Sequence, residues 1–166
     1  MSKKLKIALG VLAVIIVFCL WYTRPRSFED LAGTGEIKNY SMVVFATSAT
    51  DDKAISENWN VAGREDHDNT GTILKEILNS CKYRVKLRSL FPIPSRHMIQ
   101  GEGSITVSLS VIFDDESNIG ATYRGQTVYF DYDRTILLKA EDKEISKKLL
   151  EFAKTYGQLS ESSVKE

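Results

Sequence analysis

Residues that commonly build catalytic and metal sites are scarce in this sequence. Its 166 residues include two cysteines and two histidines, His67 and His97. The chain also lacks the GxSxG, HExxH, P-loop and GxGxxG motifs, each of which places reactive groups or backbone amides at a defined spacing. We therefore expect a non-catalytic protein without a cofactor or a metal site. The enzyme alternative is a hydrolase that uses His67 or His97.

The scarcity of cysteine excludes a disulfide scaffold. Cys19 lies inside an N-terminal apolar run, which leaves Cys81 as the one cysteine in the rest of the chain. No intramolecular disulfide can therefore form there. Cys81 also falls on the apolar stripe of a predicted helix, where a free cysteine is typically a small buried residue. We expect it to be a core residue rather than a reactive thiol.

The distribution of charge argues against nucleic acid as a partner. The chain has 22 basic and 22 acidic residues, and five of the basic residues but no acidic residue precede Phe28. The remainder has 17 basic and 22 acidic residues, which is a net charge of −5. Neutralisation of phosphates by lysine and arginine supplies most of the affinity for nucleic acid. An acidic domain of this kind is a poor candidate for it.

The most distinctive segment is an apolar run over Ile7–Tyr22, with three lysines before it and two arginines after it. Sixteen helical residues measure about 24 Å. Leu5 and the aliphatic stem of Lys6 lengthen the run toward a bilayer core of about 30 Å. Trp21 and the tyrosine after it stand where an aromatic belt is expected. Residues 1–23 are predicted to be a cytoplasmic stub and a transmembrane anchor in contact with membrane lipid.

Two other interpretations of this segment explain less of it. A cleaved signal peptide needs a small-x-small site just after the apolar run, and LWYTRPRS offers none. A bacterial lipoprotein would be lipidated on Cys19, but Phe18 stands where a lipobox has a small residue. An uncleaved signal anchor fits best. The lysines before it favour a C-terminal domain outside the cytoplasm.

The rest of the chain shows strand and helix patterns in succession. Residues 24–36 are predicted to be a juxtamembrane linker with one helical turn capped by Ser27. Strands are predicted over residues 37–47, 54–62, 82–89, 104–113, 121–125, 127–133 and 134–140. Helices are predicted over residues 73–81 and 145–156, the second with Asp142 as N-cap and Gly157 beyond its end. Residues 158–166 are predicted to be a disordered tail.

These elements assemble into one domain over residues 37–157. Short sequential strands with tight polar turns predict an antiparallel meander whose alternation leaves one face apolar. The two amphipathic helices would cover that face, and the other face would meet water. The predicted fold class is therefore α+β, with an N-terminal transmembrane helix followed by an antiparallel sheet packed on one face by two helices.

The order of elements resembles that of a known type of protein. The segments that carry the likeness are ILNSCKYRVKLRSL, SITVSLSVIFDD, TYRGQTVYFDYD and EISKKLLEFAKTYG, within residues 70–157. They are similar to the helix–meander–helix domain of small Gram-positive exported proteins that have a single membrane helix. The function of those proteins is unknown. The resemblance implies an exported, membrane-anchored α+β domain, and it implies no reaction.

The stretch Arg64–Gly71, REDHDNTG, collects carboxylates, an imidazole and an amide. Consecutive loop residues rarely converge on a zinc ion from three or four directions, and the ligand pattern of a calcium loop is missing. The same residue types are typical of a helix start, where Asp68, Asn69 or Thr70 would be the cap. We interpret the stretch as a loop and cap. A pocket joining His67 to His97 would overturn that interpretation.

The strongest candidate for a binding site is the polar face of the sheet. Alternation turns the basic residues of 82–89 to one side, beside the threonine and serines at positions 106, 108 and 110 if the two strands pair. The candidate binding residues are Arg84, Lys86, Arg88, Tyr129, Asp131 and Asp133. Solvated cross-strand ion pairs, each contributing about 0.2–1 kcal/mol, would explain them without any function.

The functional interpretation of this face is binding of an anionic envelope polymer, a lipid headgroup or a partner protein. Together with the anchor, it predicts a membrane-anchored extracytoplasmic binding or sensing module at the cell membrane. Besides the hydrolase, the remaining alternative is a subunit of a membrane complex that contacts its partners through the anchor helix.

Overall fold

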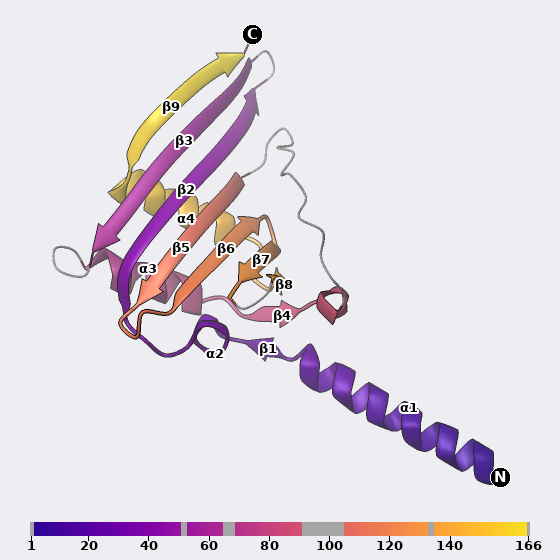
Figure 1. Cartoon of the computed structure of the whole chain (residues 1–166). Helices are drawn as coiled ribbons and strands as arrows, with labels where there is room; N and C mark the ends of the chain where they lie inside the picture. The colour runs from indigo at the N-terminus through magenta and orange to yellow at the C-terminus, as the bar shows by residue number, and fades with distance from the viewer. Residues whose placement is uncertain (1, 51–52, 65–68, 91–104, 133–134, 166) are drawn as a thin grey trace.

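The computed structural model describes residues 2–50, 53–64, 69–90, 105–132 and 135–165 (Figure 1). A single helix, α1 (Lys3–Tyr22), projects from a folded domain that contains a large sheet. The side chain of Ser2 caps α1 by accepting a hydrogen bond from the Leu5 amide, and none of the residues of α1 is buried. Twenty helical residues measure about 30 Å. By length and composition, α1 is therefore able to cross a bilayer.

The sheet has nine strands in the order β1-β4-β8-β7-β6-β5-β2-β3-β9, and all neighbours are antiparallel. The strands are β1 (Pro25–Arg26), β2 (Ile37–Thr50), β3 (Lys53–Arg64), β4 (Tyr83–Val85), β5 (Ile105–Phe113), β6 (Asn118–Arg124), β7 (Thr127–Asp131), β8 (Thr135–Ala140) and β9 (Gln158–Lys165). Strands β5 to β8 follow one another as the predicted meander. The predicted hairpin of β2 and β3 is confirmed.

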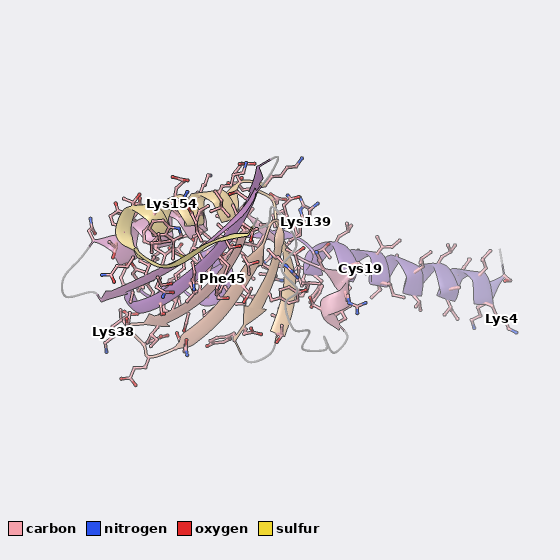
Figure 2. The ribbon with its side chains drawn as sticks, turned by 90° about the horizontal axis from the view of Figure 1, so that it is seen from above. Lys4, Cys19, Lys38, Phe45, Lys139 and Lys154 are labelled. Atoms are coloured by element: carbon pink, nitrogen blue, oxygen red, sulfur yellow. The ribbon has the colours of Figure 1, made fainter. Side chains whose placement is uncertain are left out.

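Three helices, α2 (Phe28–Ala32), α3 (Thr70–Asn79) and α4 (Ile145–Tyr156), pack on one face of the sheet. In Figure 1, α3 and α4 lie behind the strands. Figure 2 shows Lys154 on α4 at one side of the sheet, Phe45 among the strands and Cys19 out on α1. The predicted α+β class and helix-covered sheet are confirmed, and α2 joins the two helices that periodicity predicts.

Alternation along the strands determines which side chains face the helices. In β5, Val107, Leu109, Val111 and Phe113 are buried, and Ser110 between them is exposed. The edge-on contact of Phe28 with Phe130, 6.2 Å between ring centroids, attaches α2 to the same core. Cys81 is fully buried, and burial raises the pKa of its thiol. It is a core residue, as the helical stripe predicts.

The predicted strand at residues 82–89 is wrong beyond Val85. Only Tyr83–Val85 pair as β4, and Leu87–Leu90 form a 3₁₀ helix, η1. The Ser89 hydroxyl accepts a hydrogen bond from the Leu137 amide at 2.8 Å and donates one to the Leu137 carbonyl at 2.9 Å. A side chain therefore replaces the backbone in pairing with β8. The chain turns away from the sheet at this point.

The predicted linker at residues 24–36 is partly built into the domain. Ser27 caps α2 as predicted, in a reciprocal capping box with Asp30. However, β1 pairs with β4, and Phe28 is 2% exposed. The folded domain therefore begins at Pro25 rather than at residue 37.

The C-terminal residues also differ from the expectation of a disordered tail. Gln158–Lys165 form β9, which pairs with β3 at the edge of the sheet. Gly157 directs the chain from α4 into this strand. A Cβ there would lie 2.6 Å from the Ala153 carbonyl oxygen and 2.7 Å from a Val61 methyl group. The close approach of backbone and side chain explains why a glycine ends α4.

Candidate functional site

The REDHDNTG stretch begins at the last residue of β3 and ends in the first turn of α3. Asn69 occupies the N-cap position of α3, but its side chain makes no capping hydrogen bond. Residues 65–68, which include His67, lie outside the described residues, as does His97. Within the described part of the chain, no group of three or more His, Cys, Asp or Glu residues could hold a metal ion. The hydrolase alternative therefore gains no support from described geometry.

The face of the sheet turned away from α3 and α4 is here called the open face. Its side chains are those that alternate with the buried core positions, and the strand register aligns them in rows that cross the sheet. Directly opposed residues in an antiparallel sheet have Cβ atoms about 4.5–5.5 Å apart. Each row is therefore a continuous line of neighbouring side chains.

One row concentrates positive charge. Arg84 opposes Lys139, Lys139 opposes Thr127, Thr127 opposes Arg124, and Arg124 opposes Thr106. These five residues are here called the basic row. Lys86, which follows β4 in the chain, joins it, since its Nζ donates a hydrogen bond to Thr127 Oγ1 at 3.2 Å.

The charges of the basic row are only partly neutralised. The Arg84 guanidinium forms an ion pair with Glu141, with 2.6 Å between Nε and Oε1. Arg124 and Lys139 have no ion pair with any described residue. Arg124 is half-buried, and Lys139 is exposed. Within the described part of the chain, no carboxylate neutralises these two cations, although the domain is acidic as a whole.

Thr106, at the end of the basic row, has a buried hydroxyl without a partner among the described residues. Its side chain lies on the open face, yet the residue is 4% exposed, and its Oγ1 makes no hydrogen bond within this part of the chain. The Oδ1 of Asn58 is also buried and unpartnered, and Phe45 lies between these two residues in the register. Buried polar atoms are normally satisfied. Leaving one unsatisfied costs about 1–3 kcal/mol, so an unpartnered hydroxyl beside a free guanidinium suggests a site for a hydrogen-bonding ligand.

The predicted binding residues are placed as follows. Arg84, Lys86, Tyr129 and Asp131 all belong to the open face, Arg88 lies in η1, and Asp133 lies outside the described residues. Tyr129 opposes Thr122 in the row next to the basic row, and Asp131 opposes Gly120 one row further along the strands. The structure therefore places Arg84 and Lys86 together at the basic row, whereas Asp131 lies outside this row.

The basic strand would lie beside the threonine and serines of β5 only if the two strands paired, and they do not pair. Strands β8, β7 and β6 lie between β4 and β5. The polar neighbours of the basic residues are instead Thr127 and Lys139. Sequence reasoning missed Arg124, Lys139 and Thr127, although alternation in ATYRG, TVYFDYD and RTILLKA already places them opposite the core.

Comparison of the chain with protein-family models, with curated proteins and with solved structures found no significant match. The resemblance to small exported Gram-positive proteins stays a prediction.

Proposed function

We propose that this protein is a single-pass, membrane-anchored binding module whose extracytoplasmic domain binds an anionic group of its ligand on the open face. The observation that carries the proposal is the basic row, in which the Arg124 guanidinium opposes the buried Thr106 hydroxyl and neither group has a partner among the described residues. A sheet face that is merely solvated would not require a buried hydroxyl such as that of Thr106 opposite a guanidinium.

The chemistry of the row suits a phosphate or a carboxylate. A guanidinium presents its donors in a fixed planar fork that matches two anionic oxygens. Thr106 and Thr127 would add hydroxyl donors on either side of Arg124, and Lys139 would add a point charge beyond Thr127. Such a site binds and orients a ligand through its cations and hydroxyl groups. A binding or sensing role is therefore proposed rather than catalysis.

The anchor supports the location. Helix α1 is long enough for a bilayer, and three lysines precede its apolar run. The positive-inside rule then assigns the N-terminus to the cytoplasm and the domain to the outside. An anionic envelope polymer, a lipid headgroup and an acidic partner protein are the classes of ligand that reach this position.

The test compares two charge-matched double variants of the full chain in nanodiscs. Arg124→Gln with Lys139→Gln removes two cations of the row that form no ion pair with a described residue, and Lys147→Gln with Lys154→Gln removes two charges from α4 on the opposite side. The probes are inorganic polyphosphate and isolated envelope material. We expect the first variant to bind at least about tenfold more weakly, because charge-assisted hydrogen bonds contribute about 1.5–3 kcal/mol each.

The α4 variant should bind polyphosphate as the unmodified chain does. Equal losses in both variants would show that only net charge matters, and unchanged binding in both would refute the basic row as a site. Binding to envelope material but not to polyphosphate would narrow the ligand to a larger anionic structure.

A further inference from the structure

The 3₁₀ helix η1 presents two leucines to its surroundings. Leu87 and Leu90 are each 45% exposed, and Arg88 between them is exposed as well. Residues three apart in a 3₁₀ helix lie on the same side. The two leucines therefore form one apolar pair. Ser89 is only 5% exposed and is tied to Leu137 of β8 by two hydrogen bonds, so η1 is held firmly while its leucines face outward.

The register of β1 and β4 brings η1 to the end of the apolar helix. Pro25 opposes Arg84 and Arg26 opposes Tyr83 in this antiparallel pair. The chain that continues beyond β4 therefore runs beside the chain that precedes Pro25, which is the last turn of α1. In Figures 1 and 2, the short turn after β4 lies beside the end of α1 that enters the domain.

The junction between α1 and the domain is well connected. Tyr22 is half-buried and packs against the domain core. The Thr23 hydroxyl donates to the Cys19 carbonyl at 2.8 Å and closes the helix end. The guanidinium carbons of Arg24 and Arg26 lie 5.8 and 5.9 Å from the centroid of the Trp21 ring. The two residues of β1 pair with β4, and these contacts hold the end of α1 against the domain. The orientation of α1 relative to η1 is thereby defined.

The residues at this junction are those that occupy a membrane surface. Tryptophan, tyrosine and arginine gather where hydrocarbon gives way to headgroups, with the rings and stems in the apolar layer and the charges in the polar layer. The apolar surface of α1 ends at Trp21 and Tyr22, and the exposed leucines of η1 lie beside this end of the helix. Arg88 on η1 places a positive charge next to these leucines, as Arg24 does next to the end of α1.

We propose that η1 is a second membrane contact, whose Leu87 and Leu90 enter the boundary between headgroups and hydrocarbon while Arg88 meets anionic lipid. The proposal rests on the membrane span of α1 but not on ligand binding by the open face. Two contacts on one surface prevent the domain from swivelling about Thr23 and Arg24. They direct the side of the sheet that carries β1 and β4 toward the bilayer, so the basic row begins near the lipid surface with Arg84 and runs away from it.

The test measures the depth of single labels in the full chain reconstituted in nanodiscs of phosphatidylcholine and phosphatidylglycerol. An environment-sensitive fluorophore is attached to Leu87→Cys or Leu90→Cys in a Cys19→Ser background. Cys81 is fully buried, so the background without an added cysteine should take up no label. The matched control is Leu159→Cys, because Leu159 is a leucine of similar exposure, 47%, on the far edge strand β9.

We expect a blue shift and loss of most of the emission with shallow doxyl-labelled lipid at positions 87 and 90, and neither effect at position 159. A label at Leu12→Cys, quenched by deep doxyl lipid, reports the span of α1 separately. If position 12 is not quenched, the span itself is refuted. If position 12 is quenched while positions 87 and 90 behave like 159, the membrane contact of η1 is refuted.

A blue shift at positions 87 and 90 without quenching by lipid would also overturn the proposal, because it would place a second copy or another protein on η1. Replacing phosphatidylglycerol by phosphatidylcholine tests the role of Arg88. A shallower position of the labels at 87 and 90 in the neutral bilayer supports attraction of the Arg88 side chain to anionic lipid. Unchanged depth would limit the contact to the two leucines and refute the electrostatic part.

Discussion

Replacing Thr106 by valine separates the stability of the open face from its proposed binding role. Valine has nearly the same shape as threonine, so the substitution removes the hydroxyl and leaves the packing around it in place. The hydroxyl is buried and unpartnered, and its desolvation is therefore a cost that no internal hydrogen bond offsets. We expect Thr106→Val to stabilise the free protein by about 1–2 kcal/mol. This would raise the Tm by roughly 3–6 °C.

The same substitution should weaken binding of polyphosphate, because the hydroxyl beside Arg124 would no longer donate to an anionic oxygen. The assay is a thermal melt followed by circular dichroism, paired with a titration of the same preparation. Thr106→Ser keeps the hydroxyl and should keep binding. Thr122→Val, at a half-buried position on the same face, should change neither quantity appreciably. A lower Tm for Thr106→Val would show that the hydroxyl has a stabilising partner and would refute the reasoning.

Three further outcomes follow from the packing. Phe28→Ala should destabilise the domain by about 3–5 kcal/mol in a denaturant titration, since the ring is buried against Phe130; a loss below about 1 kcal/mol would mean that α2 is a linker after all. Gly157→Ala should cost about 1–3 kcal/mol because of the close contacts at its Cβ position, with faster hydrogen exchange in β9 as the local readout. Burial raises the pKa of the phenols of Tyr83 and Tyr123 above the ordinary value, so the unfolded chain releases these protons first as pH rises. Stability should therefore be intact below about pH 10 and fall above it, and a flat profile there would contradict the assignment.

The two buried tyrosines also illustrate how the core is satisfied. Tyr83 donates to the Leu78 carbonyl at 3.1 Å, and its oxygen lies 3.3 Å from that of Tyr123. Both hydroxyls are thereby accommodated beneath the helices. Thr106 on the opposite face lacks any such arrangement, and this contrast is why its hydroxyl is informative.

Local patterns in the sequence determined the apolar helix, the β2–β3 hairpin, the one-sided strands of the meander and the two amphipathic helices. Each of these features depends on the spacing of apolar residues along a single segment, and burial of one face is enough to select helix or strand. Alternation likewise separates Arg124 and Lys139 from the core side of their strands. These features could be predicted because neighbours in the chain carry the whole signal.

Only the tertiary structure decided which segments lie side by side. The polar segment Gln158–Lys165 carries little strand pattern of its own, and it becomes β9 because the edge of β3 offers unpaired backbone groups. Arg84 lies beside Lys139 because β4 pairs with β8, where the hydrogen bonds of Ser89 to Leu137 end the pairing. Strands β8, β7 and β6 separate β4 from β5. Period-two alternation says which face a residue occupies but not which strand stands next to it. The basic row and the position of η1 at the end of α1 both depend on that long-range register, which no local stretch of sequence contains.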